Sequence, residues 1–402
     1  MFSSLQMIFE RLLADVDTRY QRYLFHEFTL SNRLTGLVGP RGVGKTTLLL
    51  QVIKTQFATT ESVFYFSADH IYFKSATLYE FVEGLYLNNG ITTVFIDEIH
   101  KYSNWSQELK NLYDGFPQLT IIFSGSSSLD LVKGAYDLSR RAKMYHLPGL
   151  SFREYLQFFH DIELPQLAFP DLLANAVSLN QAMVAIPGIL GHYHHYLQYG
   201  FYPFVKDDPL SYYEKILLTI EKTIYEDIAN FYNLKTANLV HLSKILNFIS
   251  TIPPGNINIH NLAKNLNIND KTAASYLTML NETGLITLIY AAEGGNQGLR
   301  KPQKIFFDNT NLHYAISEHS PQATDIGSIR ELAFLQATTN AQLTVNYSQQ
   351  GDFQINEAIF EIGGKNKTRQ QVKGLGNAFI IKDDIIAASH GVIPLLFFGL
   401  LY

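Results

Sequence analysis

The chain has 402 residues, enough for two or three domains at roughly 150 residues per domain. Its 31 Lys and Arg residues against 36 Asp and Glu residues give a net charge of −5, which argues against a surface coated in basic residues for non-specific nucleic-acid binding but leaves a local basic patch open. Hydrophobic residues make up 47% of the chain and charged residues 17%, which excludes a disordered chain, and the absence of cysteine excludes disulfides, thiolate zinc sites and cysteine nucleophiles.

The two ends of the chain show no pattern typical of export or membrane insertion. Residues 1–6 have no basic region and are soon followed by Glu10, so we expect no signal peptide. The uncharged run from Ile385 to Tyr402 is interrupted by Gly391 and Pro394 and is shorter than the ~20 mostly apolar residues of a transmembrane helix. We therefore expect buried strands at the end of a domain, and a soluble cytoplasmic protein without a membrane partner.

The first part of the chain predicts a parallel β-sheet covered by helices. An amphipathic helix is expected from Leu5 to Tyr23, because apolar residues recur along one face at helical spacing. Short apolar runs then alternate with helical stretches, which is typical of buried parallel strands covered on both faces. The five predicted strands are residues 34–38, 63–66, 94–96, 119–123 and 144–147.

Three segments with other patterns follow. Residues 161–240 are rich in helical periodicity and punctuated by prolines, which predicts a helical lid or linker. Residues 241–300 contain short helices followed by a strand-like run, and residues 301–402 mix helix and strand again. We therefore predict an α/β protein divided into residues 1–160, 161–240, 241–300 and 301–402.

A phosphate-binding loop is predicted between the first strand and the next helix. The segment fits the pattern G-x-x-x-x-G-K-[ST] and stands in the strand–loop–helix context that this motif requires. Its glycines let the backbone turn N–H groups toward phosphate oxygens, and the start of the helix adds the positive end of its dipole. We expect Lys45 to neutralise the β- and γ-phosphates and Thr46 to bind Mg²⁺. The predicted nucleotide-binding residues here are Gly39, Pro40, Arg41, Gly42, Val43, Gly44, Lys45, Thr46 and Thr47.

A second motif, Val94 to Glu98, is an apolar strand that ends in two acids. We assign Asp97 to Mg²⁺, directly or through water, and Glu98 to the attacking water, because in-line hydrolysis needs a positioned nucleophile. An Asp-Glu pair after a strand is by itself more often an exposed turn. Together with the phosphate loop, it predicts Mg²⁺-dependent hydrolysis of ATP.

Hydroxyl and arginine side chains follow the fourth predicted strand. Ser124 and Ser126 belong to a serine-rich run, where hydroxyls beside the phosphate loop would contact the γ-phosphate or orient the water, although such a run alone indicates only a turn. Arg140 and Arg141 come shortly after. Either arginine would contact the γ-phosphate of its own subunit or of a neighbouring one. The alternative, that they are ordinary surface arginines, has equal weight.

These segments together resemble a known family. Residues 39–46, 95–100, 124–127 and 148–155 are similar to those of the prokaryotic AAA-family ATPases that carry a C-terminal domain of unknown function. Residues 200–203 resemble a glycine-proline turn in the helical region of that family, and the likeness extends over nearly the whole chain.

The resemblance also bears on an arginine finger. The family's Leu-Ala/Ser-Gly-Arg segment aligns its arginine with Arg141, while Arg140 stands where the family has glycine. The resemblance implies ATP and Mg²⁺ as cofactors, and a C-terminal part made of a winged helix and a nuclease-like domain.

A helix-turn-helix is predicted at residues 259–266 and 270–280, with Asn269 or Asp270 as the N-cap of the second helix and a hairpin from Leu285. This is a winged-helix pattern. In a DNA-binding protein, the base-reading residues would be Lys271, Thr272 and Ser275, and the wing would carry Arg300, Lys301 and Lys304. The second helix carries one lysine against two acids, so we favour a structural or partner-binding winged helix over a DNA reader.

Acids in the last segment resemble the metal-dependent nuclease core written PD-(D/E)xK. Glu331, Asp352 and Glu361 would be the acids, with Lys365 nearby. The position two residues after Glu361 is Gly363, however, and the displaced lysine would move its amine by roughly 7 Å along a strand. We expect the fold to be kept and nuclease activity to be absent, with ordinary strand-end acids as the alternative reading.

Three histidines, His192, His194 and His195, stand close together on one predicted helix. No acidic residue is placed among them as in H-E-x-x-H, and tyrosines surround them. We therefore predict a packing helix and no metal site.

The sequence thus predicts an Mg²⁺-dependent ATPase whose nucleotide state moves a helical lid, a winged helix and a nuclease-like domain. One alternative is an ATP-regulated DNA-binding protein, and another is an ATP-gated nuclease. ATP is the expected partner, and self-association through Arg141 is open.

Overall fold

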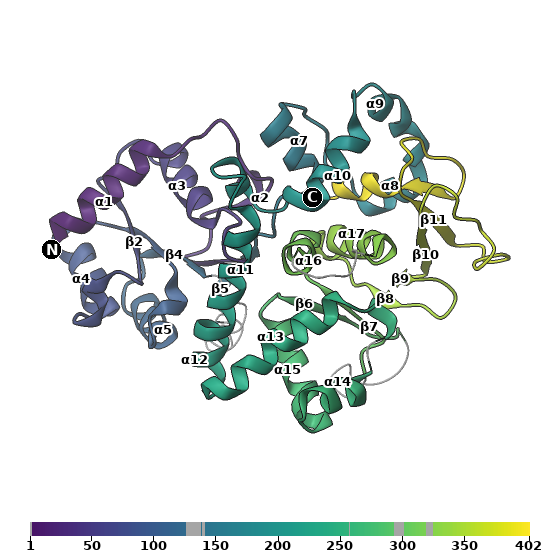
Figure 1. The fold of residues 1–402 in the computed structure, drawn as a ribbon. Coiled ribbons are helices and arrows are strands. Elements are labelled where there is room, and N and C mark those ends of the chain that lie inside the picture. Colours follow the sequence, from purple (N-terminus) through teal and green to yellow (C-terminus); the bar gives the residue numbers. More distant parts are fainter. Residues whose placement is uncertain (1, 126–137, 139–140, 257, 293–300, 319–324) are drawn as a thin grey trace. The chain divides into compact units, whose positions relative to one another are not determined.

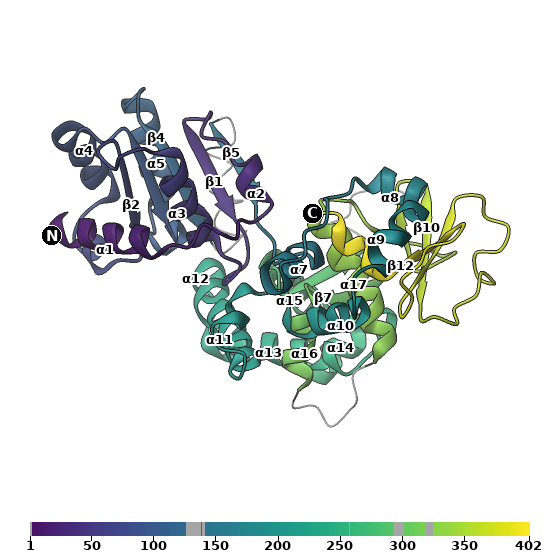
Figure 2. The same ribbon diagram turned by 90° about the horizontal axis from the view of Figure 1, so that it is seen from above.

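The computed structural model describes residues 2–125, 138, 141–256, 258–292, 301–318 and 325–402. The chain divides into two compact units, Met1–Gly149 and Leu150–Tyr402 (Figures 1 and 2). The first unit ends at Gly149, and the segments 161–240, 241–300 and 301–402 all lie within the second unit.

The first unit is built on a five-stranded sheet in the order β2-β3-β4-β1-β5, in which all neighbouring strands are parallel, as predicted. Its strands are β1 (Leu34–Val38), β2 (Val63–Ser67), β3 (Thr93–Asp97), β4 (Thr120–Gly125) and β5 (Ala142–His146). Its helices are α1 (Phe2–Asp15), α2 (Leu24–Glu27), α3 (Lys45–Gln56), α4 (Leu78–Asn89) and α5 (Trp105–Gly115).

The strand order decides which loops meet. Parallel strands present all their carboxyl ends at one edge of the sheet, and β4 lies between β1 and β3. The loop after β1, the acids at the end of β3 and the hydroxyl of Ser124 on β4 therefore share this edge. The central strands β1, β3 and β4 are buried along most of their length, as expected for a sheet covered on both faces.

The first helix is shorter than predicted, because it ends at Asp15 instead of continuing to Tyr23. The carbonyls beyond this point are bonded by side chains of α3 rather than by helical N–H groups. Gln51 Nε2 donates to the carbonyls of Asp17 and Tyr20 at 2.7 and 2.8 Å, and Lys54 Nζ donates to that of Val16 at 2.9 Å. The polar side chains of another helix thus end α1, a contact that helical periodicity does not reveal.

The second unit begins with a helical region, as predicted. Its helices are α7 (Phe152–His160), α8 (Phe169–Asn175), α9 (Asn180–Val184), α10 (Ile189–Tyr199), α11 (Tyr212–Lys222) and α12 (Ala229–Tyr232), with a π-helix (Thr223–Ile228) between the last two. Three further helices follow: α13 (Thr236–Ser250), α14 (Ile259–Leu266) and α15 (Asp270–Glu282). The later helices are α16 (Thr310–Ser317) and α17 (Ile326–Asn340).

One buried asparagine connects distant parts of this unit. Asn311 Oδ1 accepts from the backbone N–H of Phe201 at 3.0 Å and from the Tyr212 hydroxyl, and its Nδ2 donates to the carbonyl of Leu197 at 2.8 Å. Asn311 is fully buried, and buried polar groups are stabilising only when their hydrogen bonds are made. It therefore fixes α16 against α10 and the turn that follows it.

The predicted helix-turn-helix forms as α14 and α15, and Asn269 caps α15 by accepting from Thr272 N at 2.8 Å. A two-stranded antiparallel sheet follows, made of β6 (Ile286–Ile289) and β7 (Lys304–Phe307). In the DNA-binding alternative, Lys304 would lie along the wing with Arg300 and Lys301. Lys304 begins β7 but is buried, whereas Lys301 is exposed and Arg300 lies outside the described residues.

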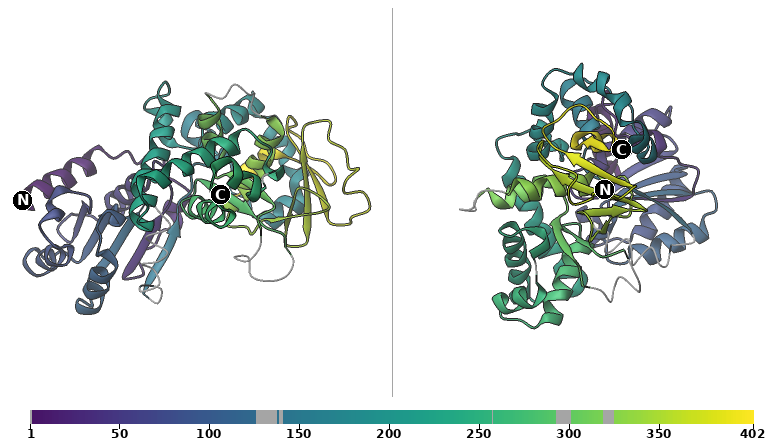
Figure 3. Two further views of the ribbon diagram at one scale, coloured as in Figure 1. Left: turned by 60° about the horizontal axis from the view of Figure 1, so that its bottom comes forward. Right: turned by 90° about the vertical axis from the view of Figure 1, so that its right-hand side faces the viewer.

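The C-terminal part contains a second sheet, drawn in yellow-green in Figure 3. It has five strands in the order β12-β11-β10-β9-β8. Its strands are β8 (Asn346–Tyr347), β9 (Phe353–Ile355), β10 (Ala358–Gly363), β11 (Ala378–Lys382) and β12 (Val392–Pro394). Strands β8, β9 and β10 pair antiparallel, and β10, β11 and β12 pair parallel. Helix α17 packs against β10.

The apolar end of the chain is buried, but it is mostly not the strand structure that we predicted. Strand β12 is only three residues long, and residues Leu395–Leu400 form a 3₁₀ helix that packs against α17. Pro394 ends the strand because it has no N–H to donate to a neighbour.

Within the described residues, no single helix has the length and apolar character needed to cross a membrane. One pair bent by 104°, Phe169–Val184 with Ile189–Tyr199, meets that test only when its two parts are taken together.

Candidate functional site

The loop after β1 has the backbone geometry that phosphate binding requires. Gly42 and Gly44 have φ values of 81° and 95°, in the left-handed region that glycine adopts without strain. A Cβ atom on Gly39 would lie 2.1 Å from the carbonyl oxygen of Leu147, so no other residue fits there without displacing the backbone after β5. Helix α3 begins at Lys45, directly after the loop. The predicted loop context is therefore present.

Lys45 and Thr46 lie at the start of this helix. Lys45 is 5% exposed, and its Nζ donates to the carbonyls of Gly39 and Pro40 at 2.8 Å each. The loop thus holds the ammonium group over its own backbone. Thr47, which we also assigned to nucleotide binding, is exposed.

Asp97, at the end of β3, is the centre of the hydrogen-bond network at this edge. Its Oδ2 accepts from the Thr46 hydroxyl at 2.5 Å and from the Tyr65 hydroxyl at 2.8 Å, and its Oδ1 accepts from Ser124. Asp97 is only 3% exposed. A threonine hydroxyl and a carboxylate are ligands that Mg²⁺ accepts, so Thr46 and Asp97 fit a magnesium site.

Tyr65 is a member of this network that the sequence did not point to. It stands within an apolar strand, and such a tyrosine usually indicates core packing. Burial first, and the neighbouring Asp97 second, raise its pKa far above the usual value, so the hydroxyl keeps its proton and stays a donor. The sequence does not show that β2 pairs with β3 in the register that aligns Ser67 with Asp97, and this register brings Tyr65 to Asp97.

Glu98 has a backbone conformation that is unusual for a residue other than glycine, with φ at 50°. Its carboxylate lies 3.3 Å from Nε2 of His100. Burial lowers the pKa of His100 to about 3, so at neutral pH the imidazole is uncharged, and the tautomer with its proton on Nε2 donates a hydrogen bond to the Glu98 carboxylate. Burial also raises the pKa of Glu98, while Lys45 and Arg41 oppose that shift. A carboxylate with a raised pKa suits a group that takes a proton from water.

Arg22 is a second residue that sequence reasoning missed. Its Nη1 donates to the carbonyl of Val43 in the phosphate loop at 2.6 Å, and its Nη2 donates to the carbonyls of Pro148 and Gly149 at 2.9 Å each. A single guanidinium group therefore joins the phosphate loop to the last residues of the first unit. No local motif marks Arg22, because its partners are 21 to 127 residues away.

Arg141 does not share the edge of the sheet that holds the phosphate loop. It precedes β5, whose first residue Ala142 aligns with Leu34 at the start of β1, while the loop follows Val38 at the other end. Five residues of strand separate these ends by about 16 Å. Arg141 instead pairs with Asp114 at 3.1 Å. Its position in the sheet thus places Arg141 at the end of β5 opposite to the phosphate loop, and Arg140 and Ser126 lie outside the described residues.

In the second unit, the structure brings the three predicted acids together but with different lysines. Lys304 Nζ lies 2.6 Å from Glu331 Oε2 and 3.2 Å from Asp352 Oδ1. Asp352 Oδ2 accepts from the backbone N–H of Ile362 at 2.8 Å. Burial first, and the charge of Asp352 second, raise the pKa of Glu331.

The lysine that pairs with Glu361 is not Lys365, which the sequence placed near these acids but displaced from the expected position. Lys365 is exposed, and Lys367 forms the ion pair with the buried Glu361. Strand β10 ends at Gly363, so the following turn, and not the strand, decides which lysine folds back over the acid.

Comparison with protein families finds two matches. Residues 31–156 match the AAA domain, and residues 190–323 match a domain of unknown function. An uncharacterized protein of Methanocaldococcus jannaschii is 31% identical over 284 residues, which are 67% of this chain and 59% of that protein. This chain therefore covers less than two thirds of that relative's length.

Several solved structures are similar to parts of the chain. A replication initiator DnaA bound to AMPPCP and single-stranded DNA is 16% identical, with 67% of this chain and 91% of that chain covered and a TM-score of 0.29. AMPPCP-bound DnaA from Aquifex aeolicus is 15% identical, with 67% and 93% covered and a TM-score of 0.27. A katanin structure concerned with self-assembly is 19% identical, with 43% and 62% covered and a TM-score of 0.26. At TM-scores this low, these similarities are not evidence of a shared function.

The family match coincides with the features of the first unit. It spans the parallel sheet, the phosphate loop at residues 39–46 and the acids at the end of β3. Residues 31–156 of this chain therefore match the AAA domain and have the parallel sheet and phosphate loop of a P-loop fold.

Proposed function

We propose that this chain is an Mg²⁺-dependent ATPase that couples ATP binding and hydrolysis to its second unit. The observation that carries the proposal is the 2.5 Å contact between the hydroxyl of Thr46 and the carboxylate of Asp97. Thr46 belongs to the phosphate loop, which follows β1, and Asp97 ends β3. In the sheet, β4 lies between these two strands. Their meeting provides the side chains that would hold Mg²⁺ beside a bound triphosphate.

Each residue has a distinct role in this proposal. Lys45 and the loop N–H groups bind the β- and γ-phosphates, and Mg²⁺, when bound, offsets their negative charge. Glu98 accepts a proton from the attacking water, and His100 orients the Glu98 carboxylate through its Nε2–H. Tyr65 and Ser124 hold the Asp97 carboxylate in place by donating to its two oxygens.

Arg22 supports the proposed coupling. A phosphate loop that tightens around a nucleotide shifts the carbonyl of Val43, and Arg22 bonds this carbonyl and those of Pro148 and Gly149 at once. The chain passes into the second unit immediately afterwards. A change at the loop thereby reaches the connection between the units through one rigid, planar side chain.

We further propose that the second unit is a recognition or regulatory module and that it does not cleave DNA. The supporting observation is the position of Lys304, whose ammonium lies between the carboxylates of Glu331 and Asp352. A cation already neutralises the acids that a nuclease would use to bind Mg²⁺. The helix α15 supports the same view, because its first-turn Asp270 faces His260 at 3.2 Å and places negative charge where DNA phosphates would approach.

The ATPase proposal is tested with purified full-length protein, ATP and Mg²⁺. Lys45→Ala should weaken ATP binding, while Glu98→Gln should retain binding and lose turnover by about 100-fold or more, because only proton transfer is damaged. The exposed Lys74→Ala serves as a matched control and should resemble the unaltered protein. Full turnover in Glu98→Gln would refute the assignment.

The second part is tested with linear, circular and single-stranded DNA, in the presence of Mg²⁺ or Mn²⁺ and with or without ATP. We expect no cleavage above background. Cleavage that disappears in both Asp352→Ala and Glu361→Ala would overturn this part of the proposal and leave the ATPase assignment untouched.

A further inference from the structure

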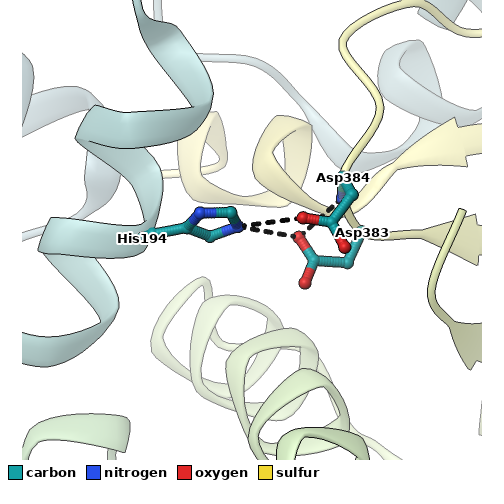
Figure 4. A group of neighbouring side chains, drawn as sticks. All are labelled: His194, Asp383 and Asp384. Atoms are coloured by element: carbon teal, nitrogen blue, oxygen red, sulfur yellow. Dashed lines mark hydrogen bonds and ion pairs between the residues drawn. The ribbon is translucent and has the colours of Figure 1, made fainter.

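A group of three side chains lies apart from the nucleotide site and from the acids around Lys304. Nε2 of His194 on α10 faces Asp383 Oδ1 at 3.6 Å and Asp384 Oδ1 at 3.3 Å, in the turn after β11 (Figure 4). Among the described residues, this is the one group of three histidine or carboxylate side chains whose ligand atoms all lie within 4.8 Å of one another. It combines one nitrogen with two carboxylate oxygens.

Arg330 on α17 fixes the direction of both carboxylates. Its Nε donates to Asp383 Oδ2 at 2.9 Å, and its Nη2 donates to Asp384 Oδ2 at 3.0 Å. Both Oδ1 atoms are thereby turned toward His194, and Asp383 Oδ1 is further held by the N–H of Asp384 at 2.8 Å. Carboxylates held by a neighbouring group in this way are typical of the shell that orients metal ligands.

The spacing of the three atoms fits a small divalent ion. Zinc held tetrahedrally at about 2.0–2.1 Å from each ligand would separate neighbouring ligand atoms by roughly 3.3–3.4 Å. The two separations from His194, 3.3 and 3.6 Å, match this within a few tenths of an ångström. The third separation, between the two carboxylate oxygens, is within 4.8 Å.

The charges also leave room for a cation. Two carboxylates carry −2 and Arg330 carries +1, so the group has a net charge of −1 when the imidazole is neutral. A nitrogen lone pair and two carboxylate oxygens repel one another unless a proton or a metal ion lies among them. The side chains of His194 and Asp384 are 44% and 38% exposed, so solvent reaches the group and can complete the coordination of an ion.

We propose that His194, Asp383 and Asp384 bind a divalent cation of the zinc type. Imidazole nitrogen with carboxylate oxygen is a donor set for borderline ions such as Zn²⁺ rather than for Mg²⁺, which prefers oxygen alone. The ion joins α10 to the turn after β11, and through Arg330 it reaches α17. It is thus a cross-link inside the second unit, and its existence does not depend on ATP hydrolysis.

The test uses full-length protein stripped of metal with a chelator and then titrated with Zn²⁺ by calorimetry. The variants are His194→Gln and Asp384→Asn, both at partly exposed positions, with the exposed His390→Gln as a matched control for the loss of one histidine. We expect the unaltered protein and His390→Gln to bind one more equivalent of Zn²⁺ than the other two, or to bind it at least about tenfold more tightly.

Thermal unfolding gives a second readout. Zn²⁺ should raise the midpoint of the unaltered protein more than that of either site variant, because an ion that binds only the folded state stabilises it. Zinc bound elsewhere, for instance beside Thr46 and Asp97, affects all proteins equally. Equal zinc stoichiometry and affinity in the unaltered protein and in both site variants would overturn the proposal and leave an ion-pair cluster only.

Discussion

Lys304 and Glu331 form an ion pair with a separation of 2.6 Å, although they are 27 positions apart in the chain. Burial alone would lower the pKa of Lys304, but Glu331 and Asp352 raise it, so the ammonium remains charged. The pair ties β7 to α17, and so connects the small antiparallel sheet to the C-terminal sheet that α17 covers.

This pair leads to a stability prediction. Lys304→Met should lower the free energy of unfolding by about 2–4 kcal/mol, because it leaves two largely buried carboxylates without their cation. Lys365→Met, which removes an exposed lysine, should change it by less than about 0.5 kcal/mol. Urea unfolding measures both. Equal midpoints for Lys304→Met and the unaltered protein would contradict the argument.

Acid should destabilise the second unit through His313. Burial lowers the pKa of this side chain to about 4, and among the described residues no hydrogen-bond partner lies at its Nε2. The folded pKa is thus below the unfolded value of about 6.5, so the unfolded state binds more protons between these two values. The contribution of His313 to stability is complete above pH 6.5 and is lost as the pH falls toward 4.

The measurement compares unfolding free energies at pH 7 and pH 4. The loss should be smaller in His313→Phe than in the unaltered protein by up to about 3 kcal/mol, which corresponds to 2.5 pKa units. The aromatic replacement keeps the contact with the ring of Phe307. An identical loss in both proteins would show that His313 does not carry the effect.

Tyr65→Phe removes one hydroxyl from the Asp97 network and changes nothing else in the strand. If Asp97 binds Mg²⁺, losing a group that orients this carboxylate should raise the Mg²⁺ concentration for half-maximal ATPase activity by about tenfold or more. Tyr72→Phe, also on the first unit, is the control. The idea fails if the Mg²⁺ dependence of Tyr65→Phe is that of the control.

Arg22→Ala should weaken ATP binding and destabilise the first unit by about 2 kcal/mol, because three carbonyls lose a charged donor. Arg22→Lys should not restore either property, since an ammonium cannot span all three carbonyls as the planar guanidinium does. Arg19→Ala removes an exposed arginine paired with Asp17 and should leave both unchanged. Nucleotide titration and thermal unfolding measure the two properties. If Arg22→Lys restored both fully, the planar guanidinium would not be needed to join the three carbonyls.

If Arg141 serves a nucleotide site, it acts in trans, and the alternative is a surface arginine without such a role. Mixing equal amounts of Lys45→Ala and Arg141→Ala proteins should restore turnover to about a quarter of the normal value, the share of sites that combine two intact parts in a random assembly. Breaking the ion pair between Arg141 and Asp114 costs little free energy, because exposed ion pairs contribute at most about 1 kcal/mol. A protein that stays monomeric with ATP and keeps full activity would exclude this role, and Lys143→Ala serves as the neighbouring control.

The sequence by itself determined the features that depend on neighbouring residues. The phosphate loop, the acids at the end of β3 and the helix pair α14–α15 are all where the pattern predicts them, because glycine spacing, apolar runs and an Asn269 cap act within a few residues. The buried run at the C-terminus was found for the same reason, although its 3₁₀ geometry was not. Helix α1 was predicted too long because the groups that end it lie on α3.

Only the tertiary structure decided which distant side chains meet. Strand order placed Tyr65 beside Asp97 and put Arg141 at the far end of β5. Packing brought Lys304 to Glu331 and Asp352, and His194 to Asp383 and Asp384, where the sequence indicated a wing residue and a packing helix. Such contacts join residues 27 to about 190 positions apart, and they depend on how whole elements pack, which local periodicity does not encode.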